Sequence, residues 1–441
     1  MRRLLLLAAL VTACAPRSAS PEPPAEAKGP ALSDAEAEAL ATAYGELGGA
    51  LGRGDFPAAL AALDRAAEID AGDPALDYLH ASVLAAAKLV TDAQEELTRL
   101  DKAGSLLVPQ KHDFPGLEGP EFERLVKAAR ARLPASASVR AFTLAERDLI
   151  PEGIAHDPKT GTFFVGSIYK RKIVAVDAKG AARDLVVDTG PPNEGLYSPL
   201  GMKFDAARGS LWVASAAVPS MPGYVEAEHR GRAALHEIDP STGKMLARYP
   251  LDAKRQGLLN DMVIGEGGEV YVTDSEGGGV HVLRPGPDAR LEEFVPPGSF
   301  GYPNGIALSD DGSTLFVADF VRGVTAIPLA TRQLRVLPHP RGVFAHGFDG
   351  LYFRRGALIG VDNGAGGGRI VRLSLTPSFD RIETATVLEA GHPDFIIPTT
   401  GVLVDDSLVY IANSQLRSFE GGKIFPPEKL FPVQVLRLPL R

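Results

Sequence analysis

The sequence predicts a mainly β chain whose C-terminal two-thirds consist of six repeats, preceded by a small α-helical domain. Two observations support this prediction. Short segments that lead into apolar strands recur along residues 136–441, and nearly all of them contain a glycine near their start. Residues 33–133, in contrast, carry apolar side chains at three- and four-residue spacing, which is typical of amphipathic helices.

Each repeat is marked by one position, which in five of the six repeats stands directly before a glycine. The marks are residues 152, 200, 260, 304, 349 and 400, so successive repeats start 44 to 60 residues apart. The strands that follow are FFVGS (163–167), LWVAS (211–215), VYVTDS (270–275), LFVADF (315–320), LIGVDN (358–363) and VYIANS (409–414). A period of about 40–50 residues made of short strands is the signature of a β-propeller, here with six blades over residues 136–441. The Pro- and Gly-rich insertion at 215–235 predicts a long loop.

Four of the six marks carry a side-chain oxygen. They are Glu152, Asn260, Asn304 and Asp349. If the blades are arranged radially, these oxygens converge on the axis of the ring. Two carboxylates and two amide oxygens, without a thiolate, suit a hard cation such as calcium. The sequence therefore predicts a metal site at one mouth of a central channel.

Four motifs of this chain resemble those of the senescence marker protein (regucalcin)/gluconolactonase family, over about residues 150–441. The motifs are EGIA (152–155), LNDM (259–262), PNGIALSDDGSTLFVAD (303–319) and FDGL (348–351). The family is related to diisopropyl fluorophosphatases and paraoxonases. The resemblance implies a six-bladed propeller with a divalent metal, usually calcium, that hydrolyses lactones, aryl esters or organophosphates. It implies that Glu152, Asn304 and Asp349 are metal ligands, and that Asn260 coordinates the metal or contacts the substrate.

The function expected from these features is calcium-dependent hydrolysis of a lactone, an aryl ester or a related small molecule. The cation would act as a Lewis acid on a carbonyl or phosphoryl oxygen. The predicted catalytic base is Asp349, further candidate bases are Asp261, Asp319 and Asp362, and the predicted substrate contacts are Asn260, His346 and Thr400. The absence of Gly-x-Ser-x-Gly and His-Glu-x-x-His motifs argues against a serine hydrolase and a zinc site. The alternative is a non-catalytic metal-binding propeller that binds a ligand or a protein.

The first 14 residues have the features of a bacterial lipoprotein signal peptide. Two arginines precede the apolar run LLLLAALV (4–11), and a lipobox-like segment ends in Cys14. Cys14 is the only cysteine of the chain, so its lipidation leaves none for a disulfide; the alternative is a signal peptide with an incidental cysteine. Ala15 follows, which by resemblance to lipoproteins of double-membraned bacteria implies lipid anchoring at the outer membrane. Residues 15–31 are rich in Pro and Ala and predict an extended tether.

Residues 32–134 predict a small helical domain. Ser33 and Glu36 form a capping-box pattern at its start. One helix pair follows the spacing of a tetratricopeptide repeat, through Gly54, Phe56, Ala59, Leu63 and Ala66. Such a domain packs on the propeller, spaces it from the membrane, or binds a protein partner.

Charge and hydropathy indicate whether the chain is suited to bind nucleic acid or to span a membrane. The net charge is −9, and after the first three residues Lys and Arg are scattered in runs no longer than the three residues 170–172, so no basic stripe for nucleic acid is predicted. Beyond the signal peptide, no stretch is long and apolar enough for a transmembrane helix.

Overall fold

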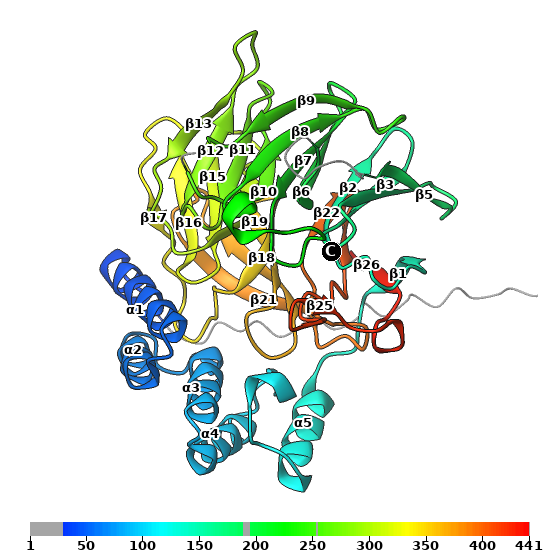
Figure 1. The fold of residues 1–441 in the computed structure, drawn as a ribbon. Helices are drawn as coiled ribbons and strands as arrows, with labels where there is room; N and C mark the ends of the chain where they lie inside the picture. The colour runs from blue at the N-terminus through cyan, green and yellow to red at the C-terminus, as the bar shows by residue number, and fades with distance from the viewer. Residues whose placement is uncertain (1–29, 188–194, 253–254, 441) are drawn as a thin grey trace, which may run out of the picture.

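Six four-stranded antiparallel sheets form a closed ring in the computed structural model, which describes residues 30–187, 195–252 and 255–440 (Figure 1). Each sheet is one blade of a propeller. The inner strand of every blade contacts the inner strand of the next, including that of the sixth blade against that of the first. The structure confirms the predicted six-bladed propeller with helices in front of it.

In the first five blades the strands run in chain order from the inner edge to the outer edge. Blade 1 contains β2 (Pro151–Asp157), β3 (Thr162–Ser167), β4 (Lys172–Val176) and β5 (Ala182–Val187). Blade 2 contains β6 (Ser198–Asp205), β7 (Ser210–Ala216), β8 (Ala233–Ile238) and β9 (Met245–Pro250). Blade 3 contains β10 (Leu259–Ile264), β11 (Val270–Asp274), β12 (Gly279–Leu283) and β13 (Leu291–Val295). Blade 4 contains β14 (Pro303–Leu308), β15 (Thr314–Asp319), β16 (Gly323–Pro328) and β17 (Arg335–Val336), and blade 5 contains β18 (Phe348–Arg354), β19 (Ala357–Asp362), β20 (Arg369–Leu375) and β21 (Ile382–Ala390).

Blade 6 joins the two ends of the propeller. Its inner three strands are β22 (Gly401–Val404), β23 (Ser407–Ile411) and β26 (Val433–Pro439), and its outer strand is β1 (Val139–Leu144). β1 pairs antiparallel with β26, with Val139 opposite Arg437. The first strand of the propeller therefore closes the last blade, which the repeat pattern alone did not indicate.

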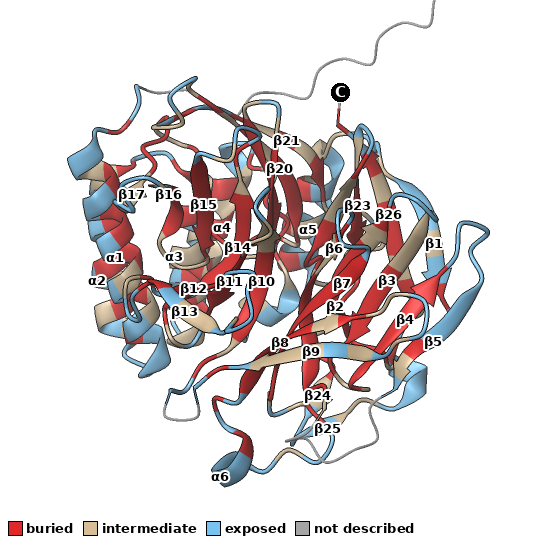
Figure 2. Ribbon diagram, turned by 90° about the horizontal axis from the view of Figure 1, so that it is seen from above, coloured by how far each residue is buried: buried red, intermediate tan, exposed pale blue. Residues whose placement is uncertain are grey.

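The core of the propeller lies between neighbouring blades. One apolar cluster fills each of the six interfaces, for example Phe164 of blade 1 with Met202 and Val213 of blade 2. The interface between blades 6 and 1 is filled in the same way, by Val409 and Val435 against residues of blade 1. Because both faces of each sheet are covered, the middle strands are apolar runs without polar alternation, and Figure 2 shows them buried along their length.

Five α-helices precede the propeller. They are α1 (Asp34–Gly52), α2 (Phe56–Ile69), α3 (Pro74–Ala86), α4 (Val90–Lys102) and α5 (Pro120–Arg132), with a 3-10 turn η1 (Lys111–Asp113) before α5. The predicted capping box is confirmed, since Ser33 Oγ accepts from the Glu36 N–H and the Glu36 carboxylate accepts from the Ser33 N–H at 2.8 Å. Ala59, Leu63 and Ala66 of α2 pack in one apolar cluster with α1.

The helices pack directly on loops of blades 4 and 5. The ring of Tyr44 in α1 lies 3.9 Å from the ring of His346, measured between centroids. Asp70, at the end of α2, is fully buried and accepts a hydrogen bond from the Gly342 N–H at 2.8 Å. Further along, the Val108 N–H donates to the Gly366 carbonyl at 3.2 Å. Of the roles expected for the helical domain, packing on the propeller is therefore the one that the contacts show.

The helices sit at the end of the ring that carries the six marks. Strand pairing shows which end of the ring this is. The second strand of a blade ends opposite the start of the inner strand, where the mark lies: Ala216 pairs with Ser198, and Asp362 pairs with Phe348. The predicted loop at 215–235 leaves this end and contains one short helix, α6 (Glu226–His229). The loop after β23 also leaves it and carries β24 (Phe419–Glu420), β25 (Lys423–Ile424) and the turn η2 (Pro427–Lys429).

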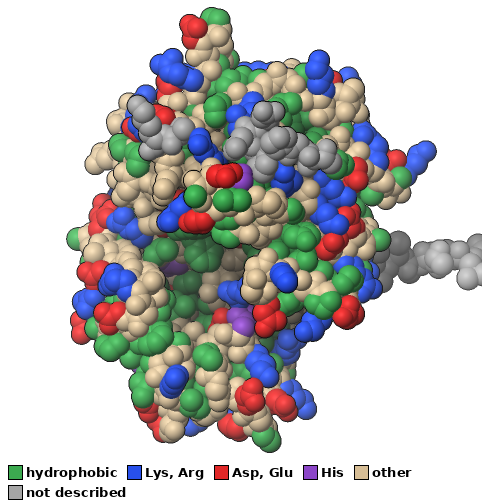
Figure 3. Space-filling view, viewed as in Figure 1, with side chains coloured by type: hydrophobic (Ala, Val, Ile, Leu, Met, Phe, Trp, Pro, Cys, Tyr) green, Lys and Arg blue, Asp and Glu red, His purple; other side chains and the backbone are tan. Residues whose placement is uncertain are grey.

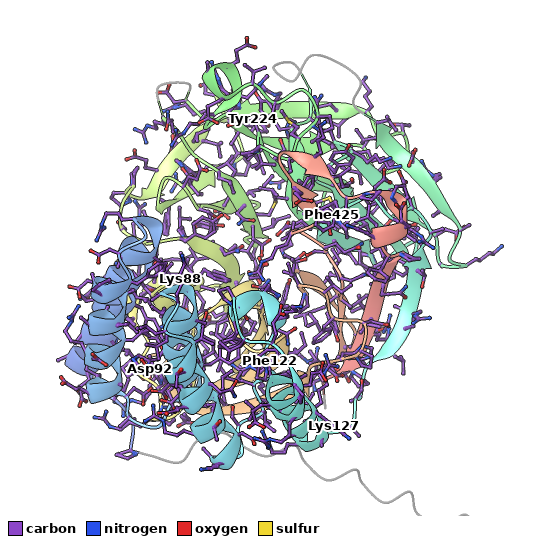
Figure 4. The ribbon with its side chains drawn as sticks, turned by 60° about the horizontal axis from the view of Figure 1, so that its bottom comes forward. Lys88, Asp92, Phe122, Lys127, Tyr224 and Phe425 are labelled. Carbon is purple, nitrogen blue, oxygen red and sulfur yellow. The ribbon has the colours of Figure 1, made fainter. Side chains whose placement is uncertain are left out.

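Figure 4 looks toward this end, with the helices in front of one half of the ring and Tyr224 and Phe425 over the other half. Figure 3 shows a hollow between the helices and the propeller loops. A surface cavity of about 680 Å³ lies instead between blades 1 and 2, lined by Asp157, Thr162, Ala207 and Ser241. Those residues belong to turns at the opposite end of the ring, so this cavity has no part in the predicted site.

The predicted lipobox with Cys14, and residues 15–29 of the predicted tether, lie outside the described residues. Among the residues that are described, none of the helices has the length and apolar character needed to cross a membrane.

Candidate metal centre

The marks occupy an irregular position at the start of the inner strands. In blades 1 to 5 the register between the inner and second strands shifts there, as between Pro151 and Ile154 or between Pro303 and Ile306. A bulge of this kind turns a side chain out of the regular alternation of a strand. In blade 6 the mark, Thr400, stands immediately before β22. The repeated bulge places the marks at the same level of the ring.

The glycine after the mark lets neighbouring inner strands approach each other closely. A β-carbon on Gly153 would overlap the carbonyl oxygen of Leu200, and one on Gly305 would lie 2.6 Å from the carbonyl oxygen of Asp349. No larger residue fits at these places without moving a neighbouring backbone. The glycines therefore explain the recurring motif, because they hold the inner strands near enough for the mark side chains to meet. Blade 3 has Asp261 at the same position.

Three marks are fixed by hydrogen bonds from amide nitrogens. Asn304 Nδ2 donates to Asp349 Oδ1 at 2.8 Å, and Asn363 Nδ2 donates to Asp349 Oδ2 at 2.7 Å. Asn260 Nδ2 donates to Ser275 Oγ at 3.0 Å. An ionised carboxylate only accepts hydrogen bonds, so the nitrogen of Asn304 must face Asp349 and its oxygen must point elsewhere.

Three oxygens of the marks are buried without a hydrogen-bond donor among the described residues. They are Glu152 Oε2, Asn260 Oδ1 and Asn304 Oδ1. Their residues are only 4 to 6% exposed, and Asp349 is 6% exposed. A buried acceptor without a donor is costly, and several acceptors together are the ligand type that a hard cation prefers. The residues at the marks therefore fit a divalent cation, although the ligand assignment itself stays a prediction. Groups of three or more His, Cys, Asp or Glu suited to a metal are absent from the described residues, so the fit depends on the two amides.

Burial and mutual repulsion perturb the carboxyl groups of the site. Burial raises the pKa of Glu152 well above its usual range, and the charges of Asp349 and Asp261 raise it further. Burial raises the pKa of Asp349 to about 6, against the hydrogen bonds from Asn363 and Asn304, which lower it. Both groups thus hold protons at a pH at which ordinary carboxyl groups are ionised, and a cation must displace those protons.

These pKa shifts predict a pH dependence of cation binding. The folded pKa of Asp349 lies above its value of about 3.9 in an unfolded chain, so the metal-free protein loses stability as pH rises from about 4 to about 6. A cation that replaces the protons offsets this loss. We expect the rise in melting temperature caused by calcium to be small at about pH 5 and to grow through about pH 6, as measured by calorimetry. A calcium effect that is the same at both ends of this range would contradict the predicted ligands.

Two residues that were predicted to contact the substrate, Thr400 and His346, are buried. Thr400 is 3% exposed, and its hydroxyl donates to the carbonyl oxygen of Glu152, which holds the Glu152 backbone at the seam between blades 6 and 1. His346 is 5% exposed and stacked on Tyr44 in the helix–propeller interface. The ring of His346 therefore lies against α1, and its predicted contact with a substrate stays a prediction.

Two of the candidate bases are already engaged in other contacts. Asp319 accepts hydrogen bonds from the backbone N–H groups of Gly301, Tyr302, Val321 and Arg322, at 2.5 to 3.2 Å. Asp362 is fully buried and paired with Arg369, whose Nη2 lies 2.6 Å from Asp362 Oδ2. Both carboxylates fix loops at the channel mouth and have no free approach to a substrate. Asp349 and Asp261 remain as candidate bases.

Sequence reasoning did not identify several residues that support the site. Asn363 and Ser275 hold Asp349 and Asn260, and each is the last residue of a recurring strand segment, VTDS or VDN. The polar ending shared by those segments was the available signal. Lys203 and Tyr352 were also missed; both lie three residues after a mark on an inner strand.

The comparison with protein families agrees with this geometry. A family model described as the SMP-30/gluconolactonase/LRE-like region matches residues 150–349. This stretch, under half of the chain, is similar to the SMP-30/gluconolactonase/LRE-like family. The match spans the marks of blades 1 to 5, from Glu152 to Asp349. None of the curated proteins matches the sequence.

Several solved structures are similar to this chain at low identity. A calcium-binding protein, regucalcin, from Agrobacterium tumefaciens is 14% identical, with a TM-score of 0.47 over 68% of this chain and 93% of its own. A gluconolactonase from Xanthomonas campestris is 16% identical, with a TM-score of 0.43 over 69% of this chain and 98% of its own. A virginiamycin B lyase from Staphylococcus aureus is 16% identical, with a TM-score of 0.43 over 62% of this chain and 80% of its own. At these scores the likeness assigns no residue of this chain a role.

Proposed function

We propose that this chain is a member of the SMP-30/gluconolactonase/LRE-like family and a hydrolase that depends on a divalent cation, with calcium as the ion and lactones or aryl esters as the substrate class. The observation that supports the proposal most directly is the set of buried, donor-free oxygens of Glu152, Asn260 and Asn304 at one mouth of the channel. The match to the family supports the hydrolytic class.

The residues that would hold the cation are Glu152, Asn260, Asn304 and Asp349. When bound, a divalent cation supplies Lewis acidity, which draws electron density from a carbonyl or phosphoryl oxygen during hydrolysis. Asn304 and Asn363 orient Asp349 by donating to its two oxygens. Thr400 orients the backbone of Glu152. These contacts fix the oxygens in place before any ligand arrives, so little ordering is needed when one binds.

Asp349 is the best candidate for the base that takes a proton from the attacking water. Each of its oxygens accepts one hydrogen bond and keeps a second lone pair. Burial, together with the nearby charges of Asp349, Glu276 and Glu152, raises the pKa of the Tyr302 phenol to about 12. Tyr302 therefore stays neutral and can donate a hydrogen bond at the mouth.

The helices and long loops limit the path to the site. The helices cover the mouth over blades 4 and 5, so a substrate must approach over the remaining blades, between the loops that carry Tyr224 and Phe425 (Figure 4). Burial and the hydrogen bond to Glu226 raise the pKa of Tyr224 to about 12, and the charge of Glu276 adds to the rise, which places the loop of blade 2 beside Glu276 of blade 3. This restricted approach favours a small-molecule substrate.

A hydrolysis panel tests the proposal. Lactones of different ring size and aryl esters are incubated with the protein in calcium or in a calcium chelator, and product is followed by pH-stat and absorbance. We expect turnover of at least one class that is lost on chelation and in Asn304→Ala. Asp288→Asn, in an exposed loop of blade 3, is the control and should keep full turnover.

The alternative function is a non-catalytic propeller that binds a ligand through its metal. One observation favours it: both oxygens of Asp349 already accept hydrogen bonds, so the best candidate base is partly engaged. Calcium binding by a protein that turns over no member of the panel would favour this alternative.

We also propose that the protein is anchored in the bacterial cell envelope, at the outer membrane, through lipid on Cys14. Cys14→Ser should abolish incorporation of labelled fatty acid and release an unprocessed or soluble periplasmic form. The readouts are labelling and membrane fractionation, and Ser18→Ala in the tether is the control that should label normally. Label retained in Cys14→Ser would exclude the lipobox.

A further inference from the structure

Two long side chains from opposite blades meet inside the channel, one level below the marks. Three residues after the marks, the inner strands carry Ala155, Lys203, Val263, Ala307, Tyr352 and Leu403. Lys203 Nζ lies 5.1 Å from the centroid of the Tyr352 ring. Lys203 belongs to blade 2 and Tyr352 to blade 5, and these blades face each other across a ring of six, so their contact spans the channel.

The third blade adds a carboxylate to this level. Asp261 stands where the other five blades have glycine after the mark, and it is 1% exposed. Its Oδ1 accepts from the Met262 N–H at 2.8 Å and lies 3.6 Å from Lys203 Nζ, while Oδ2 has no donor among the described residues. Lys203 is also close enough to Glu152 for its charge to oppose the rise of the Glu152 pKa. The ammonium group thus interacts with the metal site as well as with Asp261.

When all of these groups are ionised, their net charge balances that of a divalent ion. Glu152, Asp349 and Asp261 contribute three negative charges when ionised, and Lys203 contributes one positive charge, which leaves two negative charges in the channel. We propose that Lys203 sets the charge preference of the site, so that a divalent cation is preferred and a trivalent one is disfavoured. This inference rests on the proposed cation site and adds the residue that tunes it. The Lys203 ammonium acts as a fixed second cation beneath the mouth.

Two substitutions that nearly keep the shape of the side chain change the net charge of the channel in opposite directions. Lys203→Met removes the positive charge and keeps the length of the side chain. Asp261→Asn removes a negative charge and keeps an oxygen that can accept from the Met262 N–H. The double variant restores the original net charge. Lys172→Met is the matched control, because Lys172 is a buried lysine paired with Glu146 and Asp184 in blade 1, away from the channel.

The test measures the affinities of each protein for calcium and for terbium at one pH and ionic strength, by calorimetry and terbium luminescence. Lys203→Met should raise the ratio of terbium to calcium affinity by about tenfold or more, because the third charge of terbium interacts with the added negative charge at short range in a medium of low effective dielectric constant. Asp261→Asn should lower the ratio by a similar factor. The double variant and Lys172→Met should show the wild-type ratio.

The outcomes separate this inference from the proposed function. If the wild-type protein binds neither cation, the proposed metal site itself is wrong. A wild-type protein that binds calcium, with a terbium ratio unchanged within twofold in both single variants, overturns the role of Lys203 and leaves the metal site standing. If Lys203→Met fails to fold, Asp261→Asn alone decides, because it changes the charge without changing the shape.

Discussion

Calcium is expected to raise the melting temperature of the wild-type protein by roughly 5 °C or more at a hundredfold excess over Kd, and Asp349→Ala should remove most of that rise. Ligands that bind only the folded state stabilise it by mass action, by about 2.7 kcal/mol at this excess. Asp349 contributes formal charge as well as an oxygen, and it also holds Asn304 in place at 2.8 Å. Asn304→Ala removes one neutral ligand and should therefore reduce the rise less. The measurement is differential scanning calorimetry with calcium and with chelator.

A second variant separates a lost ligand from a damaged fold. Without a cation, Asp349 raises the pKa of Glu152, which shows that the two carboxyl groups repel each other when ionised. Asp349→Asn relieves this repulsion and retains an oxygen for the amide of Asn304 or Asn363. In chelator at neutral pH, Asp349→Asn should melt no lower than the wild type, whereas in calcium it should melt lower. A variant that melts lower under both conditions by the same amount would indicate a general packing defect and count against the site.

The repeats made the fold and the mark positions predictable from the sequence. Each blade buries both faces, so its middle strands are short apolar runs, and such runs at a period of about 40–50 residues are typical of a propeller. The glycine after the mark was visible because close approach of inner strands tolerates no β-carbon at Gly153 or Gly305. Glu152, Asn260, Asn304 and Asp349 could be found because a repeat places equivalent residues at equivalent depth in the ring.

What the sequence did not reveal depends on contacts between distant parts of the chain. β1 closes blade 6 by pairing with β26, and no local pattern of residues 139–144 specifies that partner. His346 was predicted near the channel from its distance to Asp349 along the chain, and no local pattern indicated its contact with Tyr44, some 300 residues earlier. Lys203 and Tyr352 lie at matching positions of two repeats, and only the closed ring shows that these blades face each other. A repeat specifies positions within a blade, while partners across blades come from the assembled ring.

The contact between neighbouring inner strands leads to the second large expected effect. Gly153→Ala places a β-carbon on the carbonyl oxygen of Leu200 and 3.2 Å from Cγ of Met202. Both obstacles belong to β6, and the nearer one is backbone, so rotation of a side chain cannot relieve the overlap. Overpacking of a tight interior costs about 1–3 kcal/mol and occasionally more, and we expect a loss of about 3 kcal/mol in the free energy of unfolding.

Urea titration followed by circular dichroism measures this loss. Gly52→Ala is the matched control, because Gly52 ends α1, has a helical backbone and has no atom within 4 Å of an added β-carbon. That control should unfold at or slightly above the wild-type midpoint, since alanine favours a helix over glycine by about 1 kcal/mol. Gly153→Ala should also weaken the calcium effect on melting, because separation of β2 from β6 moves Glu152 away from the other ligands. A Gly153→Ala protein with the wild-type midpoint and the full calcium effect would show that close packing of the inner strands does not position the site.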